Sequence, residues 1–166
     1  MNAFIKDTTP DEESKSELKK SKRGGNHRGI SDTVHLGEQA ELIFATKALV
    51  QKDLPISWPQ LTMSYDLLLE NKDGVIKKIQ IKASIQDSWS KKNAPHSTVF
   101  NISQMTPGKI KSIYPEDSID YFALYDVEND VWYNIPRSAT TDQVGLRIST
   151  LSSGKWEAYK EDWSFK

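Results

Sequence analysis

The chain has 166 residues and a formal net charge of −1, with 22 Lys and Arg against 23 Asp and Glu. The length fits one domain with a sizeable core, and the charge excludes a globally basic nucleic-acid binder, but not a local basic surface. The chain contains no cysteine, which excludes disulfides and cysteine-built zinc sites. It also contains neither an apolar signal core nor a membrane-length apolar run, so we expect a cytoplasmic, soluble protein.

The first 30 residues are polar and partly basic, and we expect them to form a flexible arm before a single domain over residues 31–166. A basic run without any acid lies between positions 19 and 28. Such runs are usually solvated tails, but this one is also a candidate for binding DNA phosphates. The basic residues of the arm are Lys19, Lys20, Lys22, Arg23 and Arg28.

A helix is predicted to begin near 31–32, where Ser and Asp can cap it, and to end at 52–55, which contains a proline. Residues 42–45 are apolar most of the way round the helix, which predicts that the helix is well buried. Glu41 flanks the apolar stripe, whereas Glu38 points nearly opposite to it. Helical phase therefore favours Glu41 as the carboxylate that could reach a site.

The next segment has the pattern of a β-hairpin. Two apolar strands, 64–70 and 75–83, flank a turn at 71–74 that contains Asn, Asp and Gly. These residue types tolerate the positive φ that tight turns need. Folding the chain at this turn sets Asp66 opposite Gln80, to within about one residue of register.

This hairpin brings chemically useful side chains together. Strand alternation puts Gln80 and Lys82 on one face and Ile79 and Ile81 on the other, so Asp66, Gln80 and Lys82 converge. Carboxylate and carbonyl oxygens, including the Ile81 carbonyl, suit a hard divalent cation, and a lysine can offset phosphorane charge. The structural alternative also stands, because such an acid is usually solvated or capping and a strand lysine is usually an edge charge.

Residues 86–97 are polar and are predicted to form a loop. This segment contains Trp89, Lys91 and Lys92, which are candidates for contacts with DNA. Solvated charges are the alternative for the two lysines. Ser84, on the same strand face as Lys82, could touch a phosphate or simply end the strand.

The second half of the chain alternates strands and turns. Strands are predicted at 99–102, 119–125, 131–136 and 145–148, and a last short helix or turn at 155–162. A helix followed by strands predicts one α/β domain with a mixed sheet rather than a doubly wound one.

The order of these motifs resembles the PD-(D/E)XK nuclease superfamily. More narrowly, it resembles the group I intron homing endonuclease branch, in which glutamine replaces the second acid. The similarity covers about residues 34–165 and includes the aromatic C-terminal segment. The segments that carry it are Gly37–Glu41, Tyr65–Leu69, Ile79–Ser84, Asp120–Tyr125 and Val131–Pro136.

The resemblance implies an α/β fold with a restriction-endonuclease-like core, a mixed β-sheet flanked by helices. It also implies catalytic roles: Asp66 as the metal-binding acid, Gln80 in place of the second acid, and Lys82 as the catalytic lysine. Glu41 matches the helix carboxylate. In two departures, Ser64-Tyr65 replaces the name-giving proline, and Gln80 removes a negative charge, which weakens metal binding unless Glu41 compensates.

The function implied is a Mg²⁺-dependent endonuclease, with Mn²⁺ as a substitute ion, that hydrolyses double-stranded DNA at specific sites. The metal ligands would be Asp66, Gln80, Ile81 and Glu41. A chain of this size offers little surface for reading a long site, so we expect a homodimer or homotetramer. Two alternatives remain: a structure-specific, junction resolvase-like repair or recombination nuclease, and a catalytically inactive DNA-binding module of the same fold, which Gln80 favours.

Overall fold

The computed structural model describes residues 30–86, 88–94, 96–106, 110–151 and 154–166. The chain divides into two units, 1–33 and 34–166, and the second unit by itself contains the whole β-sheet structure. The basic residues predicted to bind DNA from the arm lie outside the described residues; they are Lys19, Lys20, Lys22, Arg23 and Arg28.

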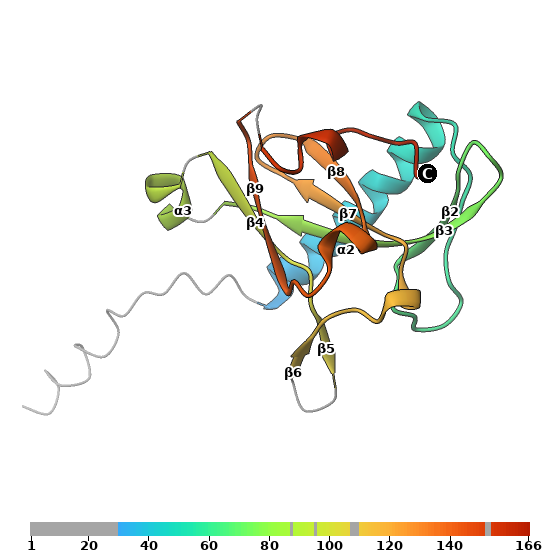
Figure 1. Cartoon of the computed structure of the whole chain (residues 1–166), viewed down its shortest axis with the longest axis horizontal. Helices are drawn as coiled ribbons and strands as arrows, with labels where there is room; N and C mark the ends of the chain where they lie inside the picture. Colours follow the sequence, from blue (N-terminus) through green and yellow to red (C-terminus); the bar gives the residue numbers. More distant parts are fainter. Residues whose placement is uncertain (1–29, 87, 95, 107–109, 152–153) are drawn as a thin grey trace, which may run out of the picture. The chain divides into compact units, whose positions relative to one another are not determined.

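A five-stranded mixed sheet forms the centre of the domain (Figure 1). Strands β3 and β7 run parallel, and every other neighbouring pair is antiparallel. The prediction of a mixed sheet is therefore confirmed. In spatial order the strands are β1 (Ile56–Ser57), β2 (Leu67–Glu70), β3 (Ile76–Ser84), β7 (Tyr121–Asp126) and β8 (Val131–Pro136).

The other elements surround this sheet. Two further antiparallel pairs form, β4 with β9 and β5 with β6. The first predicted helix is present as α2, followed by a π-helical turn η2. The bounds are α2 (Ile30–Thr46), η2 (Lys47–Gln51), α3 (Ser88–Asn93), β4 (Ser97–Asn101), β5 (Gln104–Thr106), β6 (Ile110–Ser112), η3 (Glu116–Ser118), η4 (Arg137–Thr140), β9 (Gly145–Ser149) and η5 (Glu157–Tyr159).

The prediction of a loop over residues 86–97 is wrong in its middle, where the six-residue helix α3 lies. A helix this short in a polar segment has no apolar periodicity from which it could be recognised. Lys91 and Lys92 occupy its last turn, where positive charges interact favourably with the helix dipole.

One face of the sheet packs against α2. Ala40 and Phe44 are buried in a cluster with Ile79 and Ile81 of β3, and the Phe44 ring meets Trp132 edge-on at 5.2 Å between centroids. Positions 40, 44 and 48 repeat every four residues along one side of the helix, so they share the face that touches the sheet.

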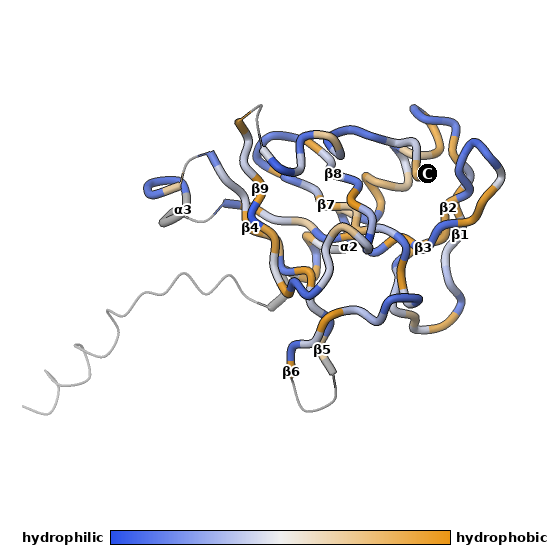
Figure 2. Tube along the Cα trace, in the orientation of Figure 1, coloured by the Kyte–Doolittle hydropathy of each residue, from blue (hydrophilic) through white to orange (hydrophobic). Residues whose placement is uncertain are grey.

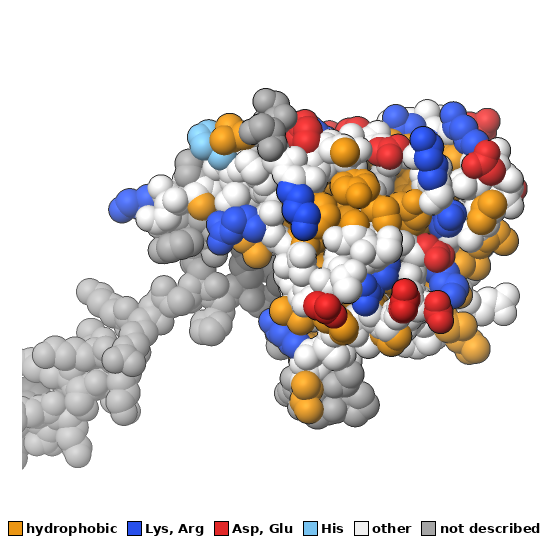
Figure 3. Space-filling model, in the orientation of Figure 1, with side chains coloured by type: hydrophobic (Ala, Val, Ile, Leu, Met, Phe, Trp, Pro, Cys, Tyr) orange, Lys and Arg blue, Asp and Glu red, His pale blue; other side chains and the backbone are white. Residues whose placement is uncertain are grey.

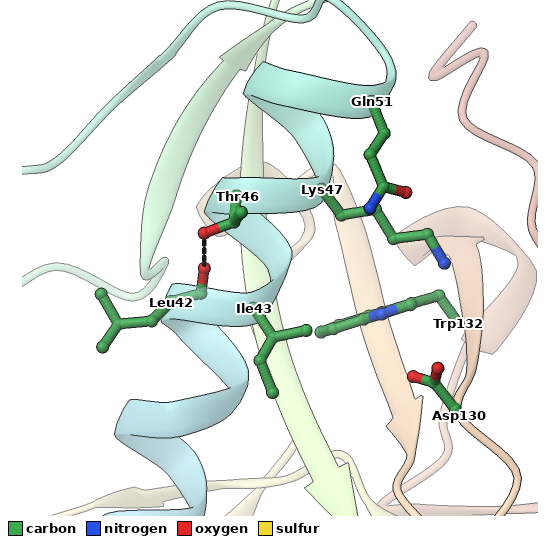
Figure 4. A pocket seen from close by; sticks show the side chains of 7 residues that line it. All are labelled: Leu42, Ile43, Thr46, Lys47, Gln51, Asp130 and Trp132. Atoms are coloured by element: carbon green, nitrogen blue, oxygen red, sulfur yellow. Dashed lines mark hydrogen bonds between the residues drawn. The ribbon is translucent and has the colours of Figure 1, made fainter.

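The prediction that the helix is well buried around residues 42–45 is only half right. Phe44 and Ala45 are buried, but Leu42 is 63% and Ile43 41% exposed. Leu42 lies about 200° round the helix from both Ala40 and Phe44, so it points away from the sheet. Leu42 and Ile43 instead line a cavity of about 380 Å³ in front of the Trp132 indole (Figure 4).

Strands β4 and β9 supply apolar side chains to the opposite face of the sheet. Phe100 and Leu146 from this pair join a cluster with Phe122 and Leu124 of β7. Strand alternation explains the division, because neighbouring residues of β7 enter different clusters, with Ala123 in the α2-side cluster.

Glu161 links the C-terminal segment to η2 and β8. Its carboxylate accepts hydrogen bonds from Lys47 Nζ at 3.0 Å, Trp132 N at 2.9 Å and Trp163 Nε1 at 3.0 Å. Burial favours a raised pKa, but these donors outweigh it and lower the pKa of Glu161. The ionised carboxylate thus joins three segments that are distant in sequence.

The predicted hairpin turn at 71–74 is confirmed. Asn71 Oδ1 accepts from Asp73 N at 3.0 Å and from Val75 N at 2.8 Å, and Gly74 adopts a φ of +76°. The side chain of Asn71 thus holds the loop by bonding its own backbone, and Gly74 adopts the positive φ without strain. Figure 2 shows the turn as hydrophilic.

Candidate active site

The β2–β3 pairing sets Asp66 beside Gln80. Leu67 pairs with Ile79 in the ladder, and Asp66 N donates to the Ile79 carbonyl at 2.9 Å, so the predicted register is confirmed. Asp66 Oδ2 accepts from Gln80 Nε2 at 2.5 Å and from Ile81 N at 2.7 Å. One carboxylate oxygen therefore receives both a side-chain and a backbone donor from the neighbouring strand.

Lys82 lies on the same face as Gln80 and within electrostatic range of two carboxylates. Burial lowers the pKa of Lys82, while the negative charges of Asp66 and Glu41 oppose that shift. Burial also raises the pKa of Asp66, against the hydrogen bond from Ile81, the charge of Lys82 and the hydrogen bond from Gln80. The centre therefore holds partly desolvated groups of both signs, an arrangement that clusters at functional sites.

Glu41 reaches this centre from α2. Burial, followed by the charges of Asp66 and Glu38, raises the pKa of Glu41, and Lys82 lowers it. Glu38 is exposed and lies 3.4 Å from His35 on the helix surface. This arrangement supports the choice of Glu41 over Glu38.

The oxygen donors at this centre fit a hard divalent cation. Asp66, Glu41, the Gln80 amide and the Ile81 carbonyl are the ligand types that Mg²⁺ and Mn²⁺ accept, and Mg²⁺ keeps several waters. Within the described residues, no cluster of three or more Asp, Glu, His or Cys side chains could hold a metal. The protein would therefore contribute few charged side-chain ligands to such a site.

The orientation of Gln80 bears directly on that fit. Its amide nitrogen, rather than its oxygen, points at Asp66 and also lies 3.2 Å from the Ile81 carbonyl. For Gln80 to share a cation with Asp66, its amide has to turn by about 180°, a rotation that exchanges two groups of nearly equal shape. A cation shared by both side chains and the Gln80–Asp66 hydrogen bond are thus alternatives.

The other residues predicted to contact DNA lie at the end of β3 or in the segment after it. Ser84 Oγ donates to the Val99 carbonyl at 2.7 Å, which supports its strand-ending role. Lys91 on α3 pairs with Glu128 at 2.6 Å, and Lys92 is exposed. The Trp89 side chain lies outside the described residues. On the face drawn in Figure 3, basic and acidic side chains are interspersed.

Sequence reasoning missed Tyr114, which is buried beside the centre. Its ring lies 5.8 Å from Lys82 Nζ, and burial together with the charge of Asp66 raises the pKa of Tyr114 to about 12. Tyr114 follows a short exposed strand and precedes a proline, so no periodic pattern marks it. The sequence offers only an aromatic residue between Ile113 and Pro115 in a stretch without a regular pattern.

The cavity beside α2 is separate from this centre. It is lined by Leu42, Ile43, Thr46, Lys47, Gln51, Asp130 and Trp132 (Figure 4), none of which belongs to the predicted catalytic set. The presence of a cavity therefore does not mark the position of the candidate catalytic centre in this domain.

A mixed sheet with a helix on one face and an acid, an amide and a lysine on its central hairpin defines a restriction-endonuclease-like fold. The chain belongs to the PD-(D/E)XK endonuclease family, whose model matches residues 31–166. The resemblance noted in the sequence is thereby confirmed, and the protein is a nuclease by family.

A solved structure shares the fold. The bacterial homing endonuclease I-Ssp6803I superimposes with a TM-score of 0.65 at 19% sequence identity. The match covers 79% of this chain and 90% of that one. No curated protein sequence matches the chain. In the described part of the chain, no helix is both long and apolar enough to span a membrane.

Proposed function

We propose that the protein is a divalent-metal-dependent endonuclease that hydrolyses double-stranded DNA at specific sites. The observation that carries this proposal is the convergence of Asp66, Gln80 and Lys82 on one sheet face, within electrostatic range of Glu41. The family supports the nuclease class, and the fold shared with a homing endonuclease supports the site-specific form.

Asp66, the Gln80 amide oxygen, the Ile81 carbonyl and Glu41 would hold Mg²⁺, with Mn²⁺ as a substitute. When bound, the ion supplies positive charge to the developing phosphorane and makes water more acidic. Gln80 contributes a neutral oxygen where a second acid would add charge, so Glu41 compensates for part of that loss.

In this proposal Lys82 orients the water that attacks the phosphorus atom. As an ammonium, Nζ can orient the water while the water oxygen attacks phosphorus, and the water gives up its proton to solvent. The bond between phosphorus and the 3′ oxygen breaks, and the leaving oxygen takes a proton from solvent. The positive charge of the Lys82 ammonium offsets the charge of the phosphorane.

A second candidate is an inactive DNA-binding module. It is favoured by the amide nitrogen of Gln80 pointing at Asp66, which satisfies the carboxylate without any cation. The retention of Glu41, Asp66 and Lys82 together argues against it. Calorimetry separates the two, because an inactive module shows no Asp66-dependent binding of Mg²⁺ or Mn²⁺.

The test of the function is cleavage of supercoiled plasmid and of DNA from the source organism, with Mg²⁺ or Mn²⁺. Asp66→Ala and Lys82→Ala serve as controls. We expect metal-dependent cleavage by the wild type alone, into discrete fragments. Preference for four-way junctions over linear duplex would indicate the junction resolvase-like alternative instead. Retained DNA binding without cleavage of any substrate would contradict the nuclease proposal.

We also propose that the protein acts as a homodimer or homotetramer, because one catalytic centre per chain has to cut two strands. Exposed apolar residues on the solvent side of α2 and η2, such as Leu42 and Val50, support self-association. Analytical ultracentrifugation checks this expectation; a monomer at every concentration, with and without DNA, would contradict it.

A further inference from the structure

Tyr114 lies between β6 and η3 and is only 5% exposed. Its ring contacts Phe122 of β7 edge-on, with 5.4 Å between centroids, and Phe122 is the ladder partner of Gln80. Lys82 Nζ lies over the same ring, 5.8 Å from its centroid. Tyr114 thus joins the apolar core of this face to the catalytic lysine.

Lys82 is held without a direct ion pair. The charges of Asp66 and Glu41 both attract it, but among the described residues no carboxylate lies within 4.0 Å of its nitrogen. A close ion pair would occupy its N–H donors and neutralise the charge needed at a phosphate. An aromatic face stabilises an ammonium through its quadrupole and takes up no N–H donor in a conventional hydrogen bond.

The ring of Tyr114, and not its phenol hydroxyl, is the group that interacts with Lys82. With its pKa raised to about 12, the group stays protonated at any pH at which the protein would act. It therefore neither accepts a proton nor adds a charge beside Lys82. The ring itself is what Lys82 meets.

Arg137 fixes the backbone of Tyr114. Its Nε donates to the Tyr114 carbonyl at 3.1 Å and its Nη2 at 2.7 Å. The guanidinium is planar and rigid, so two bonds to one carbonyl define both distance and direction. Arg137 N in turn donates to the Asp120 carbonyl at 2.8 Å, which anchors Arg137 next to the start of β7.

Tyr114 also borders open space. With Arg137 and eight other residues it lines a cavity of about 620 Å³. A smaller side chain at position 114 would remove the aromatic face from Lys82, and we expect its ammonium then to move toward Asp66 or Glu41.

We propose that Tyr114 is a positioning residue of the catalytic centre: its ring holds the Lys82 ammonium free of ion pairs and directed toward the phosphate, and Arg137 holds Tyr114 in place. The consequence for catalysis rests on the proposed nuclease function. The contact between the ring and Lys82 is independent of that function and can be measured by itself.

The first test is nuclear magnetic resonance of the Lys82 ε-methylene group in metal-free protein, assigned by its loss in Lys82→Met. A nearby aromatic face shifts these protons upfield. We expect the upfield shift in the wild type and in Tyr114→Phe, and its loss in Tyr114→Leu. In Arg137→Lys, which keeps the ring but removes the paired hydrogen bonds to the Tyr114 carbonyl, we expect a smaller shift. An unchanged Lys82 signal in a folded Tyr114→Leu, or in Arg137→Lys if the leucine variant does not fold, would overturn the proposal.

The second test separates positioning from stability by single-turnover cleavage and DNA affinity. We expect Tyr114→Phe to behave as wild type, and Tyr114→Leu to lose about 10- to 100-fold in cleavage rate without loss of DNA affinity. Wild-type cleavage by Tyr114→Leu, with the ring-current shift lost, would refute the catalytic consequence. Absence of cleavage by the wild type would count against the nuclease function, while the resonance test still decides the contact.

Discussion

The side-chain amide of Gln80 donates to Asp66 Oδ2 at 2.5 Å across the β2–β3 pair. In this hydrogen bond the amide nitrogen of Gln80 faces the carboxylate oxygen of Asp66. A cation bound by both side chains would need the amide oxygen of Gln80 instead. A cation shared by Asp66 and Gln80 would therefore have to displace a hydrogen bond that the metal-free protein already makes.

Lys82→Ala should retain DNA binding and lose cleavage. Removing the group that positions the water and offsets phosphorane charge should lower the single-turnover rate by about 10²- to 10⁴-fold. Lys77→Ala is the matched control, since Lys77 is on the same strand but points to the other face. Equal cleavage by Lys82→Ala and wild type would remove Lys82 from the mechanism.

Asp66→Asn should abolish binding of Mg²⁺ or Mn²⁺ in calorimetry. For the wild type, metal competes with the proton on Asp66. Because burial raises the pKa of Asp66, metal affinity should rise with pH through that raised pKa and level off above it. Asp73→Asn, in the exposed hairpin turn, should bind metal as wild type does. Metal binding by Asp66→Asn that equals wild type would place the ion elsewhere.

Gln80→Glu should tighten Mn²⁺ binding roughly tenfold, because it adds a second anionic ligand beside Asp66. Without metal the same change sets two carboxylates together, so the melting temperature should fall at neutral pH and recover when Mn²⁺ is added. Gln60→Glu adds the same charge at an exposed position and should change neither quantity. A variant with unaltered metal affinity would show that position 80 is not a ligand.

Glu161→Gln should destabilise the fold. The folded-state pKa of Glu161 is lowered, so its ionised form stabilises the protein above the ordinary glutamate pKa, and this stability is lost as the pH falls through the folded value. Denaturant unfolding at neutral pH should show a loss of about 1–3 kcal/mol that shrinks toward acid pH.

The control for Glu161→Gln is Glu128→Gln, which removes a surface pair with Lys91 and should cost no more than about 1 kcal/mol. A Glu161→Gln variant as stable as wild type at neutral pH would contradict the role of this carboxylate in holding the C-terminal segment.

Local sequence was sufficient for the hairpin and its register. Asn71 and Gly74 specify the turn by their own backbone preferences, and strand alternation then fixes which residues share a face. For this reason the neighbourhood of Asp66, Gln80 and Lys82 could be predicted. Helical phase likewise selected Glu41, although its approach to Asp66 depends on how α2 packs.

The sequence by itself determined the turn, the strand faces and the order of the motifs, because each depends on neighbours a few positions apart. Only the tertiary structure decided that the Gln80 amide nitrogen faces Asp66 and that Tyr114 returns to lie against Lys82. These contacts join segments distant in the chain, and packing and burial select them, not the period of a helix or strand.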